Sequence, residues 1–73
     1  MSVVFAAFKS RRDALTYAHA LGRMRVPNRI VGTPPRVGSS CGLSVKFPRN
    51  AYPVAERVLS SGEFASFLGF YAG

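Results

Sequence analysis

Cys41 is the residue of this chain best suited to chemistry, and it lies in the segment Gly38-Ser39-Ser40-Cys41-Gly42. It is the only cysteine among 73 residues, so it cannot close an internal disulfide. A structural zinc site needs four nitrogen or sulfur ligands, which a single cysteine does not supply. Its neighbours are small and polar, unlike the apolar side chains around a packed thiol. Two interpretations stay open here: an inert thiol, and an accessible thiol that reacts.

Other catalytic groupings are missing from the sequence. His19 has no second histidine or carboxylate cluster at helical spacing, and Asp13 is better explained as a helix cap. The sequence contains no paired carboxylates, Ser-His-Asp set, phosphate-binding loop or dinucleotide fingerprint. We therefore expect no metal site, no bound cofactor and no hydrolytic or redox-cofactor catalysis.

The net charge of the chain is +7, from ten Lys and Arg against three Asp and Glu. Such an excess favours anionic partners: nucleic acid, phosphate-bearing ligands or an acidic protein surface. The alternative is that the charge serves only solubility or reflects an Arg-rich composition.

Composition and length predict one domain over residues 1–73, with 48% hydrophobic residues to form a core. The apolar stretch over residues 3–8 is too short for a secretory signal or a membrane span. A free cysteine without a disulfide framework fits a reducing compartment. We expect a cytoplasmic protein with no membrane association.

The first third of the chain predicts a strand and a helix. Residues 3–8 are β-branched, aromatic and small, which is typical of a buried strand. Ser10-Arg11-Arg12-Asp13 matches a capping box, in which the Asp side chain reaches back to the cap. A helix is expected from there to about Met24. Its apolar face should consist of residues three and four apart: Ala14, Leu15, Tyr17, Ala18, Leu21 and Met24.

The middle of the chain predicts two short strands. Residues 29–33 form the first, and a connection rich in Pro, Gly and Ser follows over residues 34–42. Residues 43–47 alternate between apolar and polar, as a half-buried strand does.

A second helix is expected after Asn50, which can cap it, to about Ser61. Pro53 then falls in the first turn, where no backbone donor is needed. Gly62 is placed to end the helix. A last strand is expected over residues 64–71. The buried face of the helix should be formed by Val54, Val58 and Leu59.

This β-α-β-β-α-β order predicts an α+β, ferredoxin-like sandwich: a four-stranded antiparallel sheet with two helices on one face. In that fold the end of the first strand, the start of the first helix and the 34–42 connection share one edge. Cys41 and Arg36 are therefore expected near Ser10, Arg11 and Arg12. A helix N-terminus and nearby cations lower the pKa of a thiol, so we expect a reactive thiolate.

The residues beside Cys41 have two interpretations. Ser39 and Ser40 can support the thiolate, and Gly42 permits close backbone approach beside the sulfur. Alternatively, these residues only supply the dihedral angles of a turn.

Nucleic-acid binding is the alternative function. RNA-recognition domains share this element order and stack bases on aromatic residues of the sheet. Phe5, Phe47 and Tyr71 are candidates for that role. The segment from Gly42 to Phe47, however, lacks the leading basic residue and the interior aromatic residue of the third-strand consensus in those domains.

Three segments occur together in this chain: Ser10-Arg11-Arg12-Asp13-Ala14-Leu15, Thr33-Pro34-Pro35-Arg36 and Ser39-Ser40-Cys41-Gly42-Leu43. With the elements around them, they resemble the selenium/sulfur carrier-like family over nearly the whole chain.

The resemblance implies that Cys41 holds activated sulfur or selenium as a persulfide or perselenide. The protein would relay that atom between proteins, with an acidic donor or acceptor protein as its partner. It would be a carrier more than an enzyme with its own turnover, and would need no other cofactor. A redox-sensing thiol and a simple interaction domain remain further alternatives.

Overall fold

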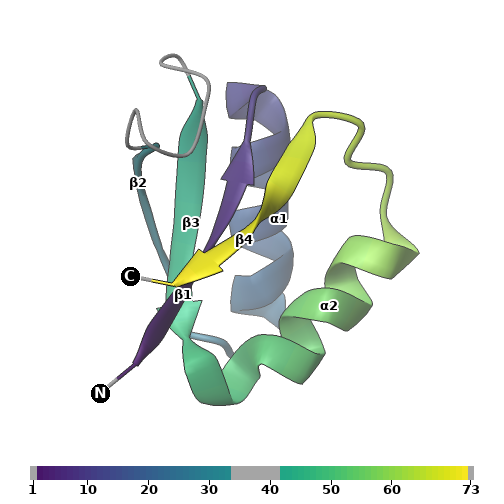
Figure 1. The fold of residues 1–73 in the computed structure, drawn as a ribbon. Coiled ribbons are helices and arrows are strands. Elements are labelled where there is room, and N and C mark those ends of the chain that lie inside the picture. The colour runs from purple at the N-terminus through teal and green to yellow at the C-terminus, as the bar shows by residue number, and fades with distance from the viewer. Residues whose placement is uncertain (1, 34–41, 73) are drawn as a thin grey trace.

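The computed structural model describes residues 2–33 and 42–72. Figure 1 shows a sheet with two helices packed on one side of it. The elements, in chain order, are β1 (Val3–Phe8), α1 (Arg11–Arg23), β2 (Arg29–Gly32), β3 (Leu43–Pro48), a short 3-10 turn η2 (Arg49–Ala51), α2 (Tyr52–Ser61) and β4 (Phe67–Ala72).

The four strands form one sheet in the order β2-β3-β1-β4, and every neighbouring pair is antiparallel. Side chains that alternate along β1 pack with residues of both helices in a single core. The buried members of that core are Val4, Ala6, Phe8, Ala14, Tyr17, Leu21, Val26, Val45, Phe47, Ala55 and Val58. The predicted α+β, ferredoxin-like arrangement is confirmed.

The buried stripe of α1 is narrower than predicted. Ala14, Tyr17 and Leu21 are fully buried, whereas Leu15 is 51% exposed and Met24 is 50% exposed. Leu15 lies about 100° around the helix from Ala14, which turns it away from the sheet. Met24 is the C-cap, one residue beyond the last helical residue.

The start of α2 differs from the prediction. Asn50 does not cap the helix, because the chain first makes the η2 turn and Ala51 takes the N-cap position without a side-chain hydrogen bond. Pro53 lies in the first turn, as predicted. Its rigid φ and missing N–H are compatible with that position.

The buried face of α2 is formed by Ala55 and Val58, while Val54 and Leu59 are only partly buried. The sequence interpretation omitted Ala55, which has no exposed surface. Gly62 follows the last helical residue with a φ of −110°, so it ends the helix without the left-handed conformation.

The last strand begins at Phe67, three residues later than predicted. Phe64 instead packs edge-on against Tyr17, with ring centroids 5.4 Å apart. A bulge interrupts the pairing of β4 with β1 next to Phe8. Gly69 adopts a φ of +138° beside it, a conformation that favours glycine.

Candidate functional site

The predicted site is described in part. Ser10, Arg11, Arg12 and Gly42 belong to the described residues. The other predicted members lie outside the described residues: Arg36, Ser39, Ser40 and Cys41.

Both ends of the 34–41 connection lie at the edge of the sheet where β1 ends. Leu43 pairs with Phe8 on one side and with Gly32 on the other. The backbone N–H of Thr33 donates to the carbonyl oxygen of Gly42 at 3.1 Å, which ties the two ends together. The connection that contains Cys41 is therefore anchored beside the strand that leads into α1, as the strand order predicts.

Gly42 lies directly against the end of β1. A Cβ atom on Gly42 would be 2.6 Å from the carbonyl oxygen of Phe8 and 3.3 Å from Thr33 Oγ1. No other residue fits without a shift of the backbone. The close approach expected at Gly42 is thus an approach to β1.

A chain of hydroxyl groups runs from this anchor across the sheet. Thr33 Oγ1 and Ser44 Oγ are 2.8 Å apart, and the Tyr71 hydroxyl donates to Ser44 Oγ at 2.9 Å. Ser44 has no exposed surface and Thr33 is 7% exposed. Buried hydroxyl groups need such partners, so this chain fixes the residues that flank the connection.

The start of α1 carries a three-residue cap. Ser10 Oγ accepts from the backbone N–H of Asp13 at 3.3 Å, as predicted. Asp13 does not reach back to Ser10; its carboxylate accepts from Ser66 Oγ at 2.7 Å and from Ser66 N at 3.1 Å. Ser66 Oγ in turn accepts from Ser10 N at 3.0 Å. The capping box therefore closes through a residue just before β4.

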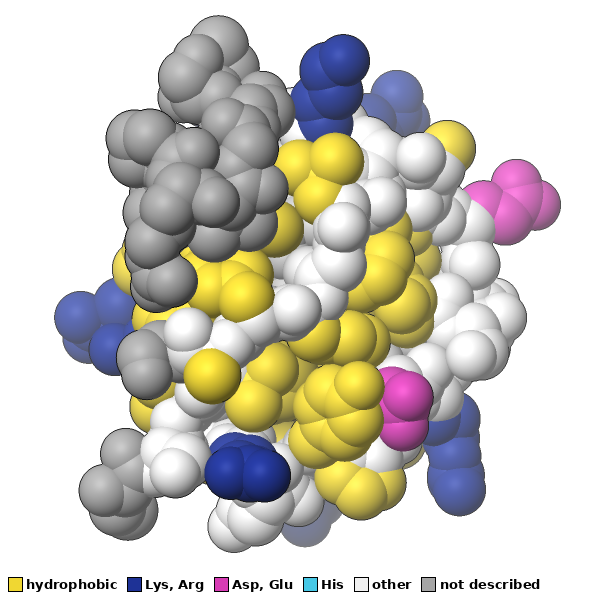
Figure 2. Space-filling model, viewed as in Figure 1, with side chains coloured by type: hydrophobic (Ala, Val, Ile, Leu, Met, Phe, Trp, Pro, Cys, Tyr) yellow, Lys and Arg dark blue, Asp and Glu magenta, His cyan; other side chains and the backbone are white. Residues whose placement is uncertain are grey.

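The charge at this edge is positive. Hydrogen bonds from the side chain and backbone of Ser66 lower the pKa of the Asp13 carboxyl below its ordinary value, and Arg12 contributes further. Desolvation acts in the opposite direction but does not dominate. Lys9, Arg11 and Arg12 are exposed. Among the described residues at this edge, three cations thus stand against one carboxylate. Figure 2 shows Lys and Arg side chains projecting at several places around the molecule.

The residues that the sequence interpretation missed are Thr33, Ser44 and Ser66. Ser44 carried a weak signal, since a polar residue in an alternating strand belongs on the face away from the helices. Nothing local to Thr33 or Ser66 indicated a partner, because their hydrogen bonds join distant parts of the chain.

Two findings apply to the described residues alone. Within residues 2–33 and 42–72, no group of three or more His, Cys, Asp or Glu side chains is arranged to hold a metal ion. Over the same part of the chain, no helix has the length and apolar character needed to cross a membrane. His19 is exposed on α1.

Comparison with known protein families gives a match over nearly the whole chain. The profile of a family described as "Putative Se/S carrier protein-like" matches residues 4–71. Searches of curated proteins and of solved structures gave no match. The matched range spans the anchors of the connection, the start of α1 and Cys41.

Proposed function

The chain belongs to the Se/S carrier protein-like family, and from this membership we propose that Cys41 carries sulfur or selenium as a persulfide or perselenide. The family match over residues 4–71 is the observation that carries the proposal. Cys41 is the only thiol of the sequence, so any carried atom bound through sulfur is bound there.

The transfer needs no external oxidant or reductant. The Cys41 thiolate attacks the outer sulfur of a donor persulfide, a bond forms between Cys41 Sγ and that sulfur, and the donor S–S bond breaks. The donor leaves as a thiolate, and Cys41 becomes the persulfide. The atom passes to a recipient by the same exchange: a thiolate of the recipient attacks the outer sulfur of the Cys41 persulfide, and Cys41 leaves as a thiolate. A perselenide transfers its selenium in the same way.

The described geometry supports this chemistry through charge. Gly42, which follows Cys41 in the chain, lies against Phe8 at the end of β1. Phe8 precedes Ser10, the N-cap of α1, by two residues. The start of α1 contributes the positive end of the helix dipole, and Arg11 and Arg12 add side-chain charge. A thiol near such groups has a lowered pKa, which raises the thiolate fraction at neutral pH.

The same charge supports the choice of partner. A surface with Lys9, Arg11 and Arg12 exposed at the edge is suited to an acidic protein that donates or accepts the atom. A carrier with a free thiol works in a reducing compartment such as the cytoplasm.

The test is intact-protein mass spectrometry after incubation with a cysteine desulfurase and cysteine. We expect an added mass of one sulfur atom that a reducing agent removes. Cys41→Ser is the matched control and should gain nothing. A parallel incubation with a selenide donor tests selenium. Absence of both adducts on the wild type, with the protein folded, would contradict the proposal.

A further inference from the structure

Four residues stand in one row across the sheet. Arg29 on β2 pairs with Lys46 on β3, Lys46 pairs with Phe5 on β1, and Phe5 pairs with Tyr71 on β4. Residues directly opposite one another in a sheet point to the same face. The Arg29–Tyr71 row therefore presents two cations followed by two aromatic rings on a single surface.

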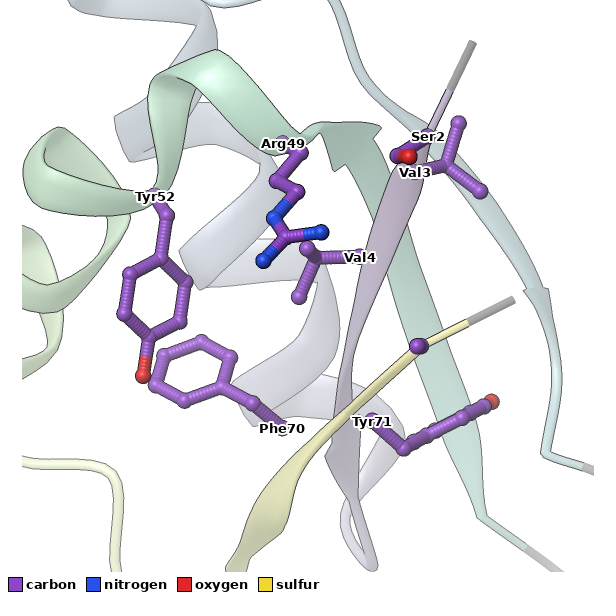
Figure 3. A pocket seen from close by; sticks show the side chains of 8 residues that line it. Ser2, Val3, Val4, Arg49, Tyr52, Phe70 and Tyr71 are labelled. Carbon is purple, nitrogen blue, oxygen red and sulfur yellow. The ribbon is translucent and has the colours of Figure 1, made fainter.

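This surface is the face away from the helices. The neighbours of Phe5 along β1, Val4 and Ala6, belong to the core beneath the helices. Figure 3 shows Phe70 pointing toward Tyr52 of α2 and Tyr71 pointing to the other side of β4. Phe47, which the sequence suggested as a stacking residue, is 1% exposed within the core and does not belong to the row.

The two aromatic rings are already ordered. Phe5 and Tyr71 stack with ring centroids 4.9 Å apart and planes 7° from parallel. The Tyr71 hydroxyl crosses β1 to donate to Ser44 on β3, which fixes the direction of the ring. Both rings are partly exposed. An ordered aromatic surface loses little conformational entropy when a planar ligand stacks on it.

The charge around the row has one sign. Arg29 is exposed and Lys46 is partly exposed, and a groove of about 360 Å³ runs past both. The three acidic residues of the chain lie elsewhere: Asp13 on α1, Glu56 on α2 and Glu63 ahead of β4.

A second groove, of about 640 Å³, adjoins the aromatic end of the row. Tyr71 lines it together with Arg49, whose guanidinium lies between Tyr52 and Val4 (Figure 3). Val4, Tyr52 and Phe70 belong to the helix side of the sheet, so the cations beside the stacked rings are Lys46 and Arg29 of the row.

We propose that the Arg29–Tyr71 row binds a single-stranded nucleic acid. A base stacks on the Phe5–Tyr71 pair, and the phosphates beside it contact Lys46 and Arg29. Aromatic rings beside cations are the combination that binds single strands, because bases offer a π face and the backbone is anionic. An acidic protein would use the charges but leaves the ordered rings without a role. The inference does not depend on Cys41 or on sulfur transfer.

The test is fluorescence anisotropy of the full chain with labelled ten-nucleotide RNA and DNA single strands and with the matching duplex. Both single strands are expected to bind at least about tenfold more tightly than the duplex, whose bases are not free to stack. Phe5→Leu should weaken binding at least about fivefold, the loss of one stacked base. Arg29→Gln with Lys46→Gln should reduce the slope of log affinity against log salt by about 1.4.

Matched controls separate this surface from overall charge. Arg57→Gln removes an exposed arginine from α2 and should change affinity less than twofold, and Cys41→Ser should leave binding unchanged.

Three results would overturn the proposal. The duplex could bind as tightly as the single strands, or Arg57→Gln could lower the affinity as much as Arg29→Gln with Lys46→Gln. The third is displacement of the oligonucleotide by poly-glutamate at the same charge concentration. If Phe5→Leu does not fold, amide chemical-shift changes in the wild type decide. They must centre on Arg29, Lys46, Phe5 and Tyr71 when RNA is added, and shifts centred on the helices would reject the row.

Discussion

Gly42 approaches Phe8 so closely that a Cβ atom on the glycine would lie 2.6 Å from the carbonyl oxygen of the phenylalanine. The opposing atom belongs to the backbone of β1, so it cannot rotate away as the end of a flexible side chain can. Leu43, the next residue, pairs with Phe8 in the sheet. The contact therefore fixes the residue after Cys41 to the strand that leads into α1.

Gly42→Ala is expected to destabilise the protein by about 1–3 kcal/mol, the usual cost of adding a methyl group to a closely packed site. Urea unfolding measures the change. Gly22→Ala is the matched control, because nothing lies within 4 Å of a Cβ there and the residue is helical. That control should stabilise by about 0.5–1 kcal/mol. Equal stability of the two variants would contradict the close contact.

Element positions were largely predictable, because the signals for β1, α1, β2 and β3 are local. The failures have local causes as well. The η2 turn displaced the start of α2 past Asn50, and no periodic pattern marks a single 3-10 turn. Phe64 has the composition of a strand residue, yet its ring packs against Tyr17 ahead of β4.

The described part of the site was less predictable than the fold. The capping residues Ser10 and Asp13 are three positions apart and were recognised, but Ser66 is 53 residues from Asp13. The bonds that join Ser44 to Thr33 and Tyr71 depend on strand register, which alternation does not fix between strands. Sequence patterns therefore predicted the position of this edge and the local bond between Ser10 and Asp13, but not the hydrogen bonds between residues distant in the chain.

Ser44→Ala is expected to destabilise the protein by about 1–3 kcal/mol, because it leaves the buried hydroxyl of Thr33 without its Ser44 partner. Tyr71→Phe removes the bond to Ser44 and leaves the bond between Ser44 and Thr33 in place, so its cost should be smaller, about 0.5–1.5 kcal/mol. Thermal or urea unfolding compares the two. Ser60→Ala, at an exposed position of α2, is the control and should stay within about 0.5 kcal/mol. A Ser44 variant as stable as this control would show that the hydroxyl chain contributes nothing.

Tyr17→Phe should give a stability difference that depends on pH. The buried Tyr17 hydroxyl donates to the carbonyl oxygen of Ala55 at 2.8 Å, so its loss should cost about 0.5–1.5 kcal/mol at neutral pH. Burial raises the pKa of Tyr17, with Tyr52 and Glu56 adding to the effect. The stabilisation is therefore complete below the unfolded value of about 10 and declines at higher pH. Urea unfolding from pH 8 to 11 should show the wild type and variant converging; a constant difference would argue against the raised pKa.

Ser66→Ala should raise the pKa of Asp13. Hydrogen bonds from Ser66 are the main cause of the lowered pKa, and the side-chain bond is the larger of the two. A lowered pKa stabilises the folded state at neutral pH, and that stabilisation is lost as the pH falls below about 4. NMR titration of the Asp13 carboxyl measures the shift, and unfolding between pH 2 and 6 should show a flatter acid limb for Asp13→Asn. An unchanged Asp13 titration in Ser66→Ala would mean that the cap does not close through Ser66.

Arg11→Gln combined with Arg12→Gln should raise the pKa of the Cys41 thiol, if the thiolate is held at the start of α1. Nearby cations favour the charged form of a thiol, so their removal favours the neutral form. The double variant should therefore shift the midpoint of the pH profile for iodoacetamide alkylation upward at low salt. Salt should reduce the difference, since exposed charges are screened. Arg57→Gln on α2 is the control for net charge and should leave the midpoint in place. Equal midpoints for the wild type and the double variant would mean that Arg11 and Arg12 do not stabilise the Cys41 thiolate. Support for the carrier proposal would then have to come from the mass measurement.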